Sequence, residues 1–465
     1  MKKMIRYDDH SGTIPLNRIT SECHYYPIFD IEQRMDEMTS PSTAYFDTVG
    51  LTNTVVQDVL GLTPGENSVK AIIKESYTGE AIVVPLKIDN KPIVTIANRS
   101  PHVKRIFFEK DAETNSSNIL YFLGDINADP NGFTKVIDDN NATISNAAYI
   151  NNTLEYIEFK ACKQLKVIGG GFSGTSSTSL EFSNCRALYV DALPDSIMWI
   201  GPSTFRNCPE VQLTHLPDSL VYIGQKAFMD CTGLGLVDVS TYDPPQGPYE
   251  YKIDSSAFSG CSNLTFGNTY YFRGWKIIGD SAFKGCTQLR AFNDSGTRDG
   301  DTVTTIGEYA FQDCVNLGLL RLPSNLQQMY QYAFALGRNR VNGVSEVVIP
   351  IDEIGQNVNY IGKNVFYKCK IMNGNNGITW KLNPLQNPTV HKDAFVGMTS
   401  VELKFGGWGN PDAVYADYEA GRDPEWQFAK VSPWWDAENQ EYLVPFGATS
   451  YVTGETLPYT IQVTG

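Results

Sequence analysis

The nine cysteines are the residues of this sequence with the most reactive side chains. Thiols can bind metal ions, form disulfides or act as nucleophiles, and each role needs a particular spacing or partner. Zinc sites and redox motifs typically pair cysteines as Cys-x-x-Cys, and this pairing occurs nowhere in the chain. We therefore predict buried free thiols that have no metal-binding or redox role.

Three other groups of residues have side chains that could do chemistry. Cys23 and His24 are adjacent, but a nucleophilic dyad also needs an orienting group that the sequence does not show. Residues 125–132 alternate oxygen-bearing side chains as a calcium loop does, yet Pro130 stands where an EF-hand needs glycine. Paired carboxylates are scattered among turns, and nothing marks them as a catalytic cleft. We therefore expect no catalytic residue, no metal site, no cofactor and no enzyme activity.

Composition and charge exclude several classes of protein. Hydrophobic residues make up 42% of the chain and charged residues 19%, which is typical of a globular protein. The 37 Lys and Arg residues against 52 Asp and Glu give a net charge of −15. Because a polyanion is repelled by a phosphate backbone, nucleic acid is not an expected partner. No apolar stretch of about 18 residues occurs, so we expect no membrane insertion, and the N-terminus lacks the apolar segment of a classical signal peptide.

The cysteines are one position of a sequence repeat. The first four of the repeat are spaced 23, 23 and 23 residues apart, and Ile-Gly precedes the phenylalanine in several units. A unit this short cannot bury its own apolar side chains, so identical neighbours must stack on it. The sequence predicts a mostly β solenoid of about 12 rungs with small non-repeat N- and C-terminal regions. A phenylalanine stands three residues before each of eight cysteines: Phe159/Cys162, Phe182/Cys185, Phe205/Cys208, Phe228/Cys231, Phe258/Cys261, Phe283/Cys286, Phe311/Cys314 and Phe366/Cys369.

The unit Ile-Gly-x-x-Ala-Phe-x-x-Cys-x-x-Leu, followed by Leu-Pro-x-Ser, resembles the BspA-type (Treponema pallidum-type) leucine-rich repeats. Residues 81–96 resemble the usual first rung of that family, and residues 414–426 resemble its terminal cap. The resemblance implies a leucine-rich-repeat solenoid. It also implies the settings in which the family occurs, which are surface and secreted proteins of gut and oral bacteria, some protists and bacteriophages.

The resemblance divides the chain into three regions. The lead-in shows helical spacing in residues 30–38 and 53–60, and the tail has strand-like runs at 442–445 and 459–463. The tail is expected to act either as a cap of the solenoid or as an assembly contact. The expected regions are an N-terminal lead-in or anchor at residues 1–78, a BspA-like solenoid with its terminal cap at 79–430, and a C-terminal β-rich tail at 431–465.

These features predict a non-enzymatic binding or adhesion protein that presents a rigid repeat surface to another macromolecule, either a protein or a surface glycan. The setting favoured by the sequence is a virion-associated structural or host-attachment protein, because a virion component needs no signal peptide. Residues 1–78 are then the candidate contact with other virion proteins. The alternatives are a bacterial cell-surface or secreted adhesin, an intracellular scaffold, and a glycan-acting enzyme. The expected location is a virion surface or an extracellular surface.

Aromatic residues that the repeat does not fix are the candidate contacts for a partner. Tyrosine offers a large contact area with a hydrogen-bonding tip, and it is enriched at interfaces. The competing interpretation is that some of these side chains only cover neighbouring rungs. Five candidates flank the Ile-Gly corners, namely Trp199, Tyr222, Tyr309, Tyr330 and Tyr332, and three lie in or beside a Pro-rich insertion, namely Tyr242, Tyr249 and Tyr251.

Overall fold

A computed structural model describes the fold. The predicted helical segments 30–38 and 53–60, the Cys23-His24 pair, the loop 125–132 and the cap sequence 414–426 lie outside the described residues. The structure describes residues 42–51, 68–109, 122–123, 154–159, 162–169, 182–237, 247, 249–266, 274–289, 302–317, 322–336, 347–349, 353–355, 357–371, 377–382, 389–391, 393–396, 400–405, 428–430, 434–436, 441–443 and 462–464.

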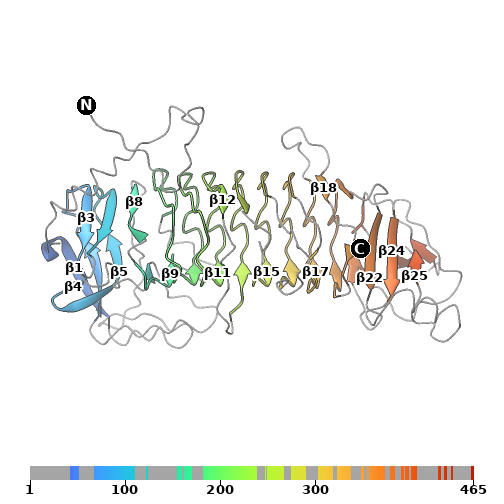
Figure 1. The fold of residues 1–465 in the computed structure, drawn as a ribbon, viewed down its shortest axis with the longest axis horizontal. Coiled ribbons are helices and arrows are strands. Elements are labelled where there is room, and N and C mark those ends of the chain that lie inside the picture. Colours follow the sequence, from blue (N-terminus) through green and yellow to red (C-terminus); the bar gives the residue numbers. More distant parts are fainter. Residues whose placement is uncertain are drawn as a thin grey trace, which may run out of the picture.

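A long parallel sheet runs along the molecule and carries one short strand from each rung (Figure 1). Its strands are short because each rung turns a corner after two or three residues. Each strand pairs with the next in parallel and in register, as stacked identical units require. In order the strands are β7 (Phe122–Leu123), β9 (Val167–Ile168), β10 (Trp199–Ile200), β11 (Tyr222–Ile223), β13 (Lys252–Ile253), β15 (Ile277–Ile278), β16 (Thr305–Ile306), β17 (Gln328–Met329), β20 (Tyr360–Ile361), β23 (Thr389–His391) and β28 (Gln462–Thr464).

A small mixed sheet and a three-stranded parallel sheet lie at the N-terminal end of the solenoid (Figure 1). A 3₁₀ turn, η2 (Thr43–Tyr45), leads into the first of these sheets. That sheet has the order β1 (Phe46–Leu51), β2 (Ser68–Ile73), β5 (Lys91–Asn98) and β4 (Lys87–Ile88). The parallel sheet contains β3 (Ala81–Val84), β6 (Arg105–Phe108) and β8 (Tyr156–Ile157).

The remaining described strands form smaller sheets. Strand β28 pairs in parallel with β23 of the long sheet, so residues 462–464 lie at the end of that sheet as its last strand. The smaller sheets are β12 (Leu236–Val237) with β14 (Thr265–Phe266), β18 (Val347–Ile349) with β21 (Cys369–Ile371), and β26 (Trp434–Asp436) with β27 (Glu441–Leu443). A four-stranded sheet contains β19 (Glu353–Ile354), β22 (Gly377–Leu382), β24 (Ser400–Phe405) and β25 (Phe428–Lys430).

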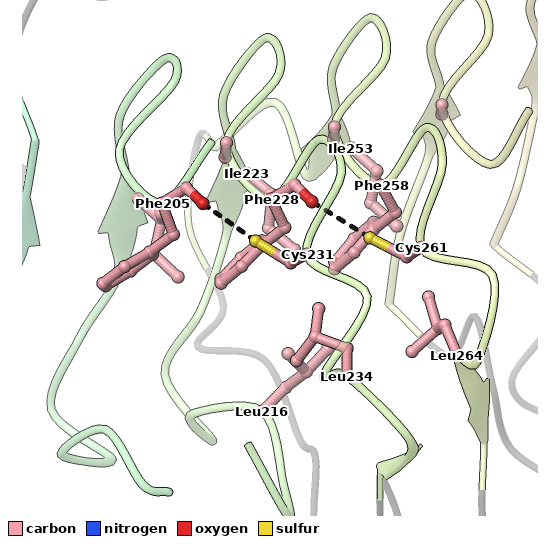
Figure 2. Close-up of a cluster of buried hydrophobic side chains, with 14 of the residues drawn as sticks. Phe205, Leu216, Ile223, Phe228, Cys231, Leu234, Ile253, Phe258, Cys261 and Leu264 are labelled. Carbon is pink, nitrogen blue, oxygen red and sulfur yellow. Dashed lines mark hydrogen bonds between the residues drawn. The ribbon is translucent and has the colours of Figure 1, made fainter. Parts of the chain in front are cut away.

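The repeated phenylalanines form a continuous stack through the core (Figure 2). The Phe228 ring lies 5.3 Å from that of Phe205 and 5.2 Å from that of Phe258, and both pairs are nearly parallel. The rings continue in this way to Phe283 and Phe311. Every ring packs on the rungs before and after it, so each unit depends on its neighbours for stability. The short repeat length predicted this dependence.

The repeated cysteines have a structural role that involves the same phenylalanines. Six of the eight repeat thiols donate a hydrogen bond to the phenylalanine carbonyl oxygen of the preceding rung (Figure 2). The Sγ···O distances are 2.9 Å for Cys208 to Phe182, 2.8 Å for Cys231 to Phe205, 3.0 Å for Cys261 to Phe228, 3.1 Å for Cys286 to Phe258, 3.1 Å for Cys314 to Phe283 and 3.1 Å for Cys369 to Phe334.

Chemical modification should show that these thiols are inert. All eight cysteines of the repeat are buried and free, and burial raises the pKa of the Cys185 thiol to about 12. Because the thiolate is the reactive form, we expect a disulfide reagent at pH 8 to leave these eight thiols unmodified in the native protein and to modify all of them in guanidinium chloride. Rapid modification of several thiols without denaturant would contradict the burial of the repeat cysteines.

Candidate binding surface

The long sheet has an outer face that lies opposite the phenylalanine stack. Side chains alternate along a strand, so the isoleucines of Trp199–Ile200 and Tyr222–Ile223 enter the core and the aromatic residues lie on the other face. The register aligns these outer positions in one column. From β9 to β23 the column contains Val167, Trp199, Tyr222, Lys252, Ile277, Thr305, Gln328, Tyr360 and Thr389.

The N-terminal half of this face is closed to solvent. Trp199 is 1% exposed and Tyr222 is 6% exposed, and their rings stack at 4.2 Å. The Tyr222 hydroxyl donates to the Asp254 carboxylate at 2.7 Å. Burial raises the pKa of the Tyr222 hydroxyl, and the negative charge of Asp254 raises it further. Tyr251 is also buried, at 5% exposed.

Three predicted contact residues therefore need correction. Trp199, Tyr222 and Tyr251 offer little exposed contact area, because all three side chains are buried, although they lie outside the main core. Of the other residues near the Pro-rich insertion, Tyr249 is half-buried with its ring edge against Tyr251, and Tyr242 lies outside the described residues.

The C-terminal half carries half-exposed tyrosines on three consecutive rungs. Tyr309 and Tyr332 stack at 5.2 Å with 13° between their rings, and the Tyr367 ring meets Tyr332 edge-on at 6.4 Å. Beside them Tyr330 and Tyr360 lie 5.0 Å apart at an angle of 40°. We call these five residues the tyrosine corner. The structure thus brings the predicted Tyr309, Tyr330 and Tyr332 together.

The backbone at two of these tyrosines has an uncommon conformation. Tyr309 and Tyr332 both have φ of 56°, in the left-handed region that bulky residues rarely occupy. Ser256 and Ser281 fill the equivalent place on other rungs with the same φ sign. The fold therefore accepts a small side chain at this position, and the two stacked tyrosines are larger than the fold requires.

Charged groups lie near the rings, but they do not create a reactive side chain. The Lys284 ammonium lies 5.4 Å from the centre of the Tyr309 ring, and the Lys368 ammonium lies 5.5 Å from that of Tyr367. Burial and the nearby Glu308 carboxylate raise the pKa of Tyr309, so its hydroxyl stays neutral at physiological pH. The Asn364 amide donates to the Tyr332 hydroxyl at 2.9 Å. The corner therefore offers aromatic area and neutral hydrogen-bonding groups.

Sequence reasoning missed Tyr360 and Tyr367. A signal for Tyr360 was present, because Tyr360-Ile361-Gly362 repeats the pattern of Tyr222-Ile223-Gly224. Tyr367 follows a repeat phenylalanine directly, and its contact with Tyr332 depends on how the corners of two rungs align. No comparable signal marks that contact in the sequence.

Two features are absent from the described residues. No group of three or more His, Cys, Asp or Glu side chains in this part of the chain is placed to hold a metal ion. None of the helices described there has the length and apolar character that a membrane crossing requires.

The fold and the repeat column define a leucine-rich-repeat solenoid protein. The family model for the BspA type leucine-rich repeat region matches six copies over residues 142–266 and 251–381. The chain belongs to this family, whose repeats generally form a non-enzymatic fold that mediates protein binding, typically at cell surfaces or outside cells.

Solved structures of leucine-rich-repeat proteins are similar at low identity. A leucine-rich-repeat protein of T. pallidum is 18% identical, with 60% of this chain and 79% of that chain covered and a TM-score of 0.25. One from Bacteroides ovatus is 18% identical, with 77% of each chain covered and a TM-score of 0.31. A leucine-rich cell surface protein from Faecalibacterium prausnitzii is 13% identical, with 73% and 91% covered and a TM-score of 0.23.

The TM-scores of these superpositions are low, so the family assignment rests on the match to the family's repeat model. A search of curated proteins finds no match.

Proposed function

We propose that this chain is a non-enzymatic binding protein that attaches to another macromolecule through the tyrosine corner. The observation that supports this most strongly is the pair Tyr309 and Tyr332, which stack in a strained left-handed conformation where other rungs have serine. Tyrosine is among the residues enriched at interfaces, and rigid rings lose little conformational entropy on binding. A solenoid keeps such rings at fixed spacing on a rigid support.

The proposed setting is a cell surface or the space outside cells, where the solenoid would bind its partner. The narrower setting is a virion-associated protein that attaches to a host, with residues 1–78 joined to other virion proteins, and bacteriophages are among the settings that the family resemblance implies. Mass spectrometry of purified phage particles tests it, because a virion component must copurify with capsid and tail proteins at constant stoichiometry. Its absence from such particles favours a bacterial surface or secreted adhesin.

The proposal is tested with the double variant Tyr309→Ser/Tyr332→Ser, which installs the residue that Ser256 and Ser281 have at the equivalent position. We expect the melting temperature to change by less than about 4 °C, because no buried core atom is lost. Attachment of labelled protein to bacterial and epithelial cells, measured by flow cytometry, should fall at least about tenfold, which corresponds to about 1.4 kcal/mol of binding free energy.

The matched control is Lys226→Ser, which changes the same repeat position on a distant rung and should keep full attachment. If the double tyrosine variant attaches as well as the wild-type protein, the tyrosine corner is not the interface. The binding surface must then lie elsewhere on the chain, with residues 1–78 and 431–465 as the next regions to test.

A further inference from the structure

A second surface adjoins the tyrosine corner on the outer face of the long sheet. Two neighbouring columns of side chains run across β16, β17 and β20 there. The backbone hydrogen bonds from Gln327 to Thr304 and from Asn359 to Gln327, both 2.8 Å, align the first column. Strand register aligns the second. Together they present six half-exposed or exposed residues, which we call the polar face: Thr304, Thr305, Gln327, Gln328, Asn359 and Tyr360.

The polar face is uncharged although the chain carries a net charge of −15. All six side chains are hydroxyls, amides or a phenol, so each can donate and accept hydrogen bonds. Among the described residues, charge begins at the borders, with Lys276 on the preceding rung and Glu308 and Lys363 beyond the corner glycines. A neutral, hydroxyl-rich ligand matches such a surface, whereas an anionic or cationic ligand would find no opposite charge within it.

The polar face also lacks the apolar centre that a protein partner needs. Protein interfaces typically have an apolar core surrounded by a polar rim, and the six side chains include no aliphatic residue. The aromatic groups are arranged differently from the stacked pair at the corner. Tyr330 and Tyr360 are inclined by 40° with their ring centres 5.0 Å apart, so these two rings are not stacked in parallel. The Tyr330 hydroxyl donates to the Gln328 side-chain oxygen at 3.2 Å. This bond orients the Gln328 amide, which is the central side chain of the second column.

From these features we propose that the polar face binds a neutral linear polysaccharide lying along the solenoid axis. Adjacent rungs of a β-sheet are about 4.8 Å apart, close to the length of one sugar unit in an extended glycan. Each rung can therefore offer a pair of hydrogen-bonding side chains to successive sugars. The ring of Tyr360 provides an aromatic surface for the C–H face of one sugar at the end of this track. This proposal rests on the proposed binding function and specifies the ligand class of the adjoining surface.

Affinity electrophoresis and a glycan array test the proposal. The probes are soluble neutral glucan, mannan and xylan, with polygalacturonate as the charged counterpart. We expect at least one neutral polysaccharide to retard the intact protein and polygalacturonate not to do so. The double variant Gln327→Ala/Gln328→Ala should lose at least tenfold in affinity for that polysaccharide. The matched control is Gln225→Ala, an exposed glutamine four rungs away, which should bind as the wild-type protein does.

Each result decides the question. Binding to charged glycans only, no binding to any neutral glycan on the array, or equal binding by the Gln327→Ala/Gln328→Ala variant overturns the neutral-glycan proposal. Cell attachment that the Tyr309→Ser/Tyr332→Ser variant loses while no neutral glycan binds would leave the proposed function in place and make the partner a protein. Thermal melting of each variant shows whether the solenoid is intact, and Thr305→Lys, which adds a charge without removing packing, repeats the test on a second rung.

Discussion

Replacing Phe228 by alanine should lower the free energy of unfolding by about 3–5 kcal/mol, the range for large-to-small changes at fully buried aromatic residues. The Phe228 ring packs between those of Phe205 and Phe258, so its loss removes two ring contacts and leaves a cavity between rungs. Its carbonyl oxygen also accepts the Cys261 thiol, and a shift of the chain around the cavity would weaken that bond as well.

The position of Phe228 in the middle of the array affects how the variant unfolds. Stability in a repeat protein is a sum over units and their interfaces, so a weak central interface can separate the unfolding of the two halves. Urea unfolding followed by circular dichroism should give a lower midpoint or two transitions. Tyr45→Ala is the matched control, because Tyr45 is an aromatic side chain that is 47% exposed. A Phe228→Ala protein that unfolds like the wild type would mean that the repeat register is wrong.

The repeat made the core of this fold predictable from sequence. One unit with phenylalanine and cysteine three residues apart is weak evidence, but eight such pairs fix which residues of each unit point inward. The prediction of a mostly β leucine-rich-repeat solenoid is confirmed by the long parallel sheet and by the family match. The acceptor of each thiol was not predictable, because the Phe228 carbonyl and the Cys261 thiol meet only through the offset between two rungs.

The outer face of the sheet was harder to predict. Alternation places Trp199, Tyr222 and Tyr360 at equivalent outward positions, yet the first two are buried and Tyr360 is half-exposed. The neighbouring column differs in the same way, because Met198 and Val221 beside the buried pair are also buried, whereas Asn359 beside Tyr360 is half-exposed. A repeat pattern specifies the inward positions of each unit. The exposure of an outward position depends on what the rungs on either side provide.

Trp199→Ala provides the sharpest test of this distinction, because it separates a packing role from a contact role. The indole is 1% exposed and stacks at 4.2 Å on Tyr222, which in turn donates a hydrogen bond to Asp254. We expect a loss of about 3–5 kcal/mol in unfolding free energy, as for other fully buried tryptophans replaced by alanine. Trp199→Phe should recover much of that loss, because a ring of similar shape can still stack on Tyr222.

Cell attachment of the Trp199 variants should follow a different pattern from stability. Below the melting temperature of each variant, Trp199→Ala should attach as well as the wild-type protein, since the tyrosine corner on distant rungs is untouched. The Tyr309→Ser/Tyr332→Ser protein should show the opposite result, with stability retained and attachment lost. If Trp199→Ala kept the wild-type unfolding midpoint but lost attachment, Trp199 would be a contact residue. The stack of Trp199 on Tyr222 would then have to open for the partner.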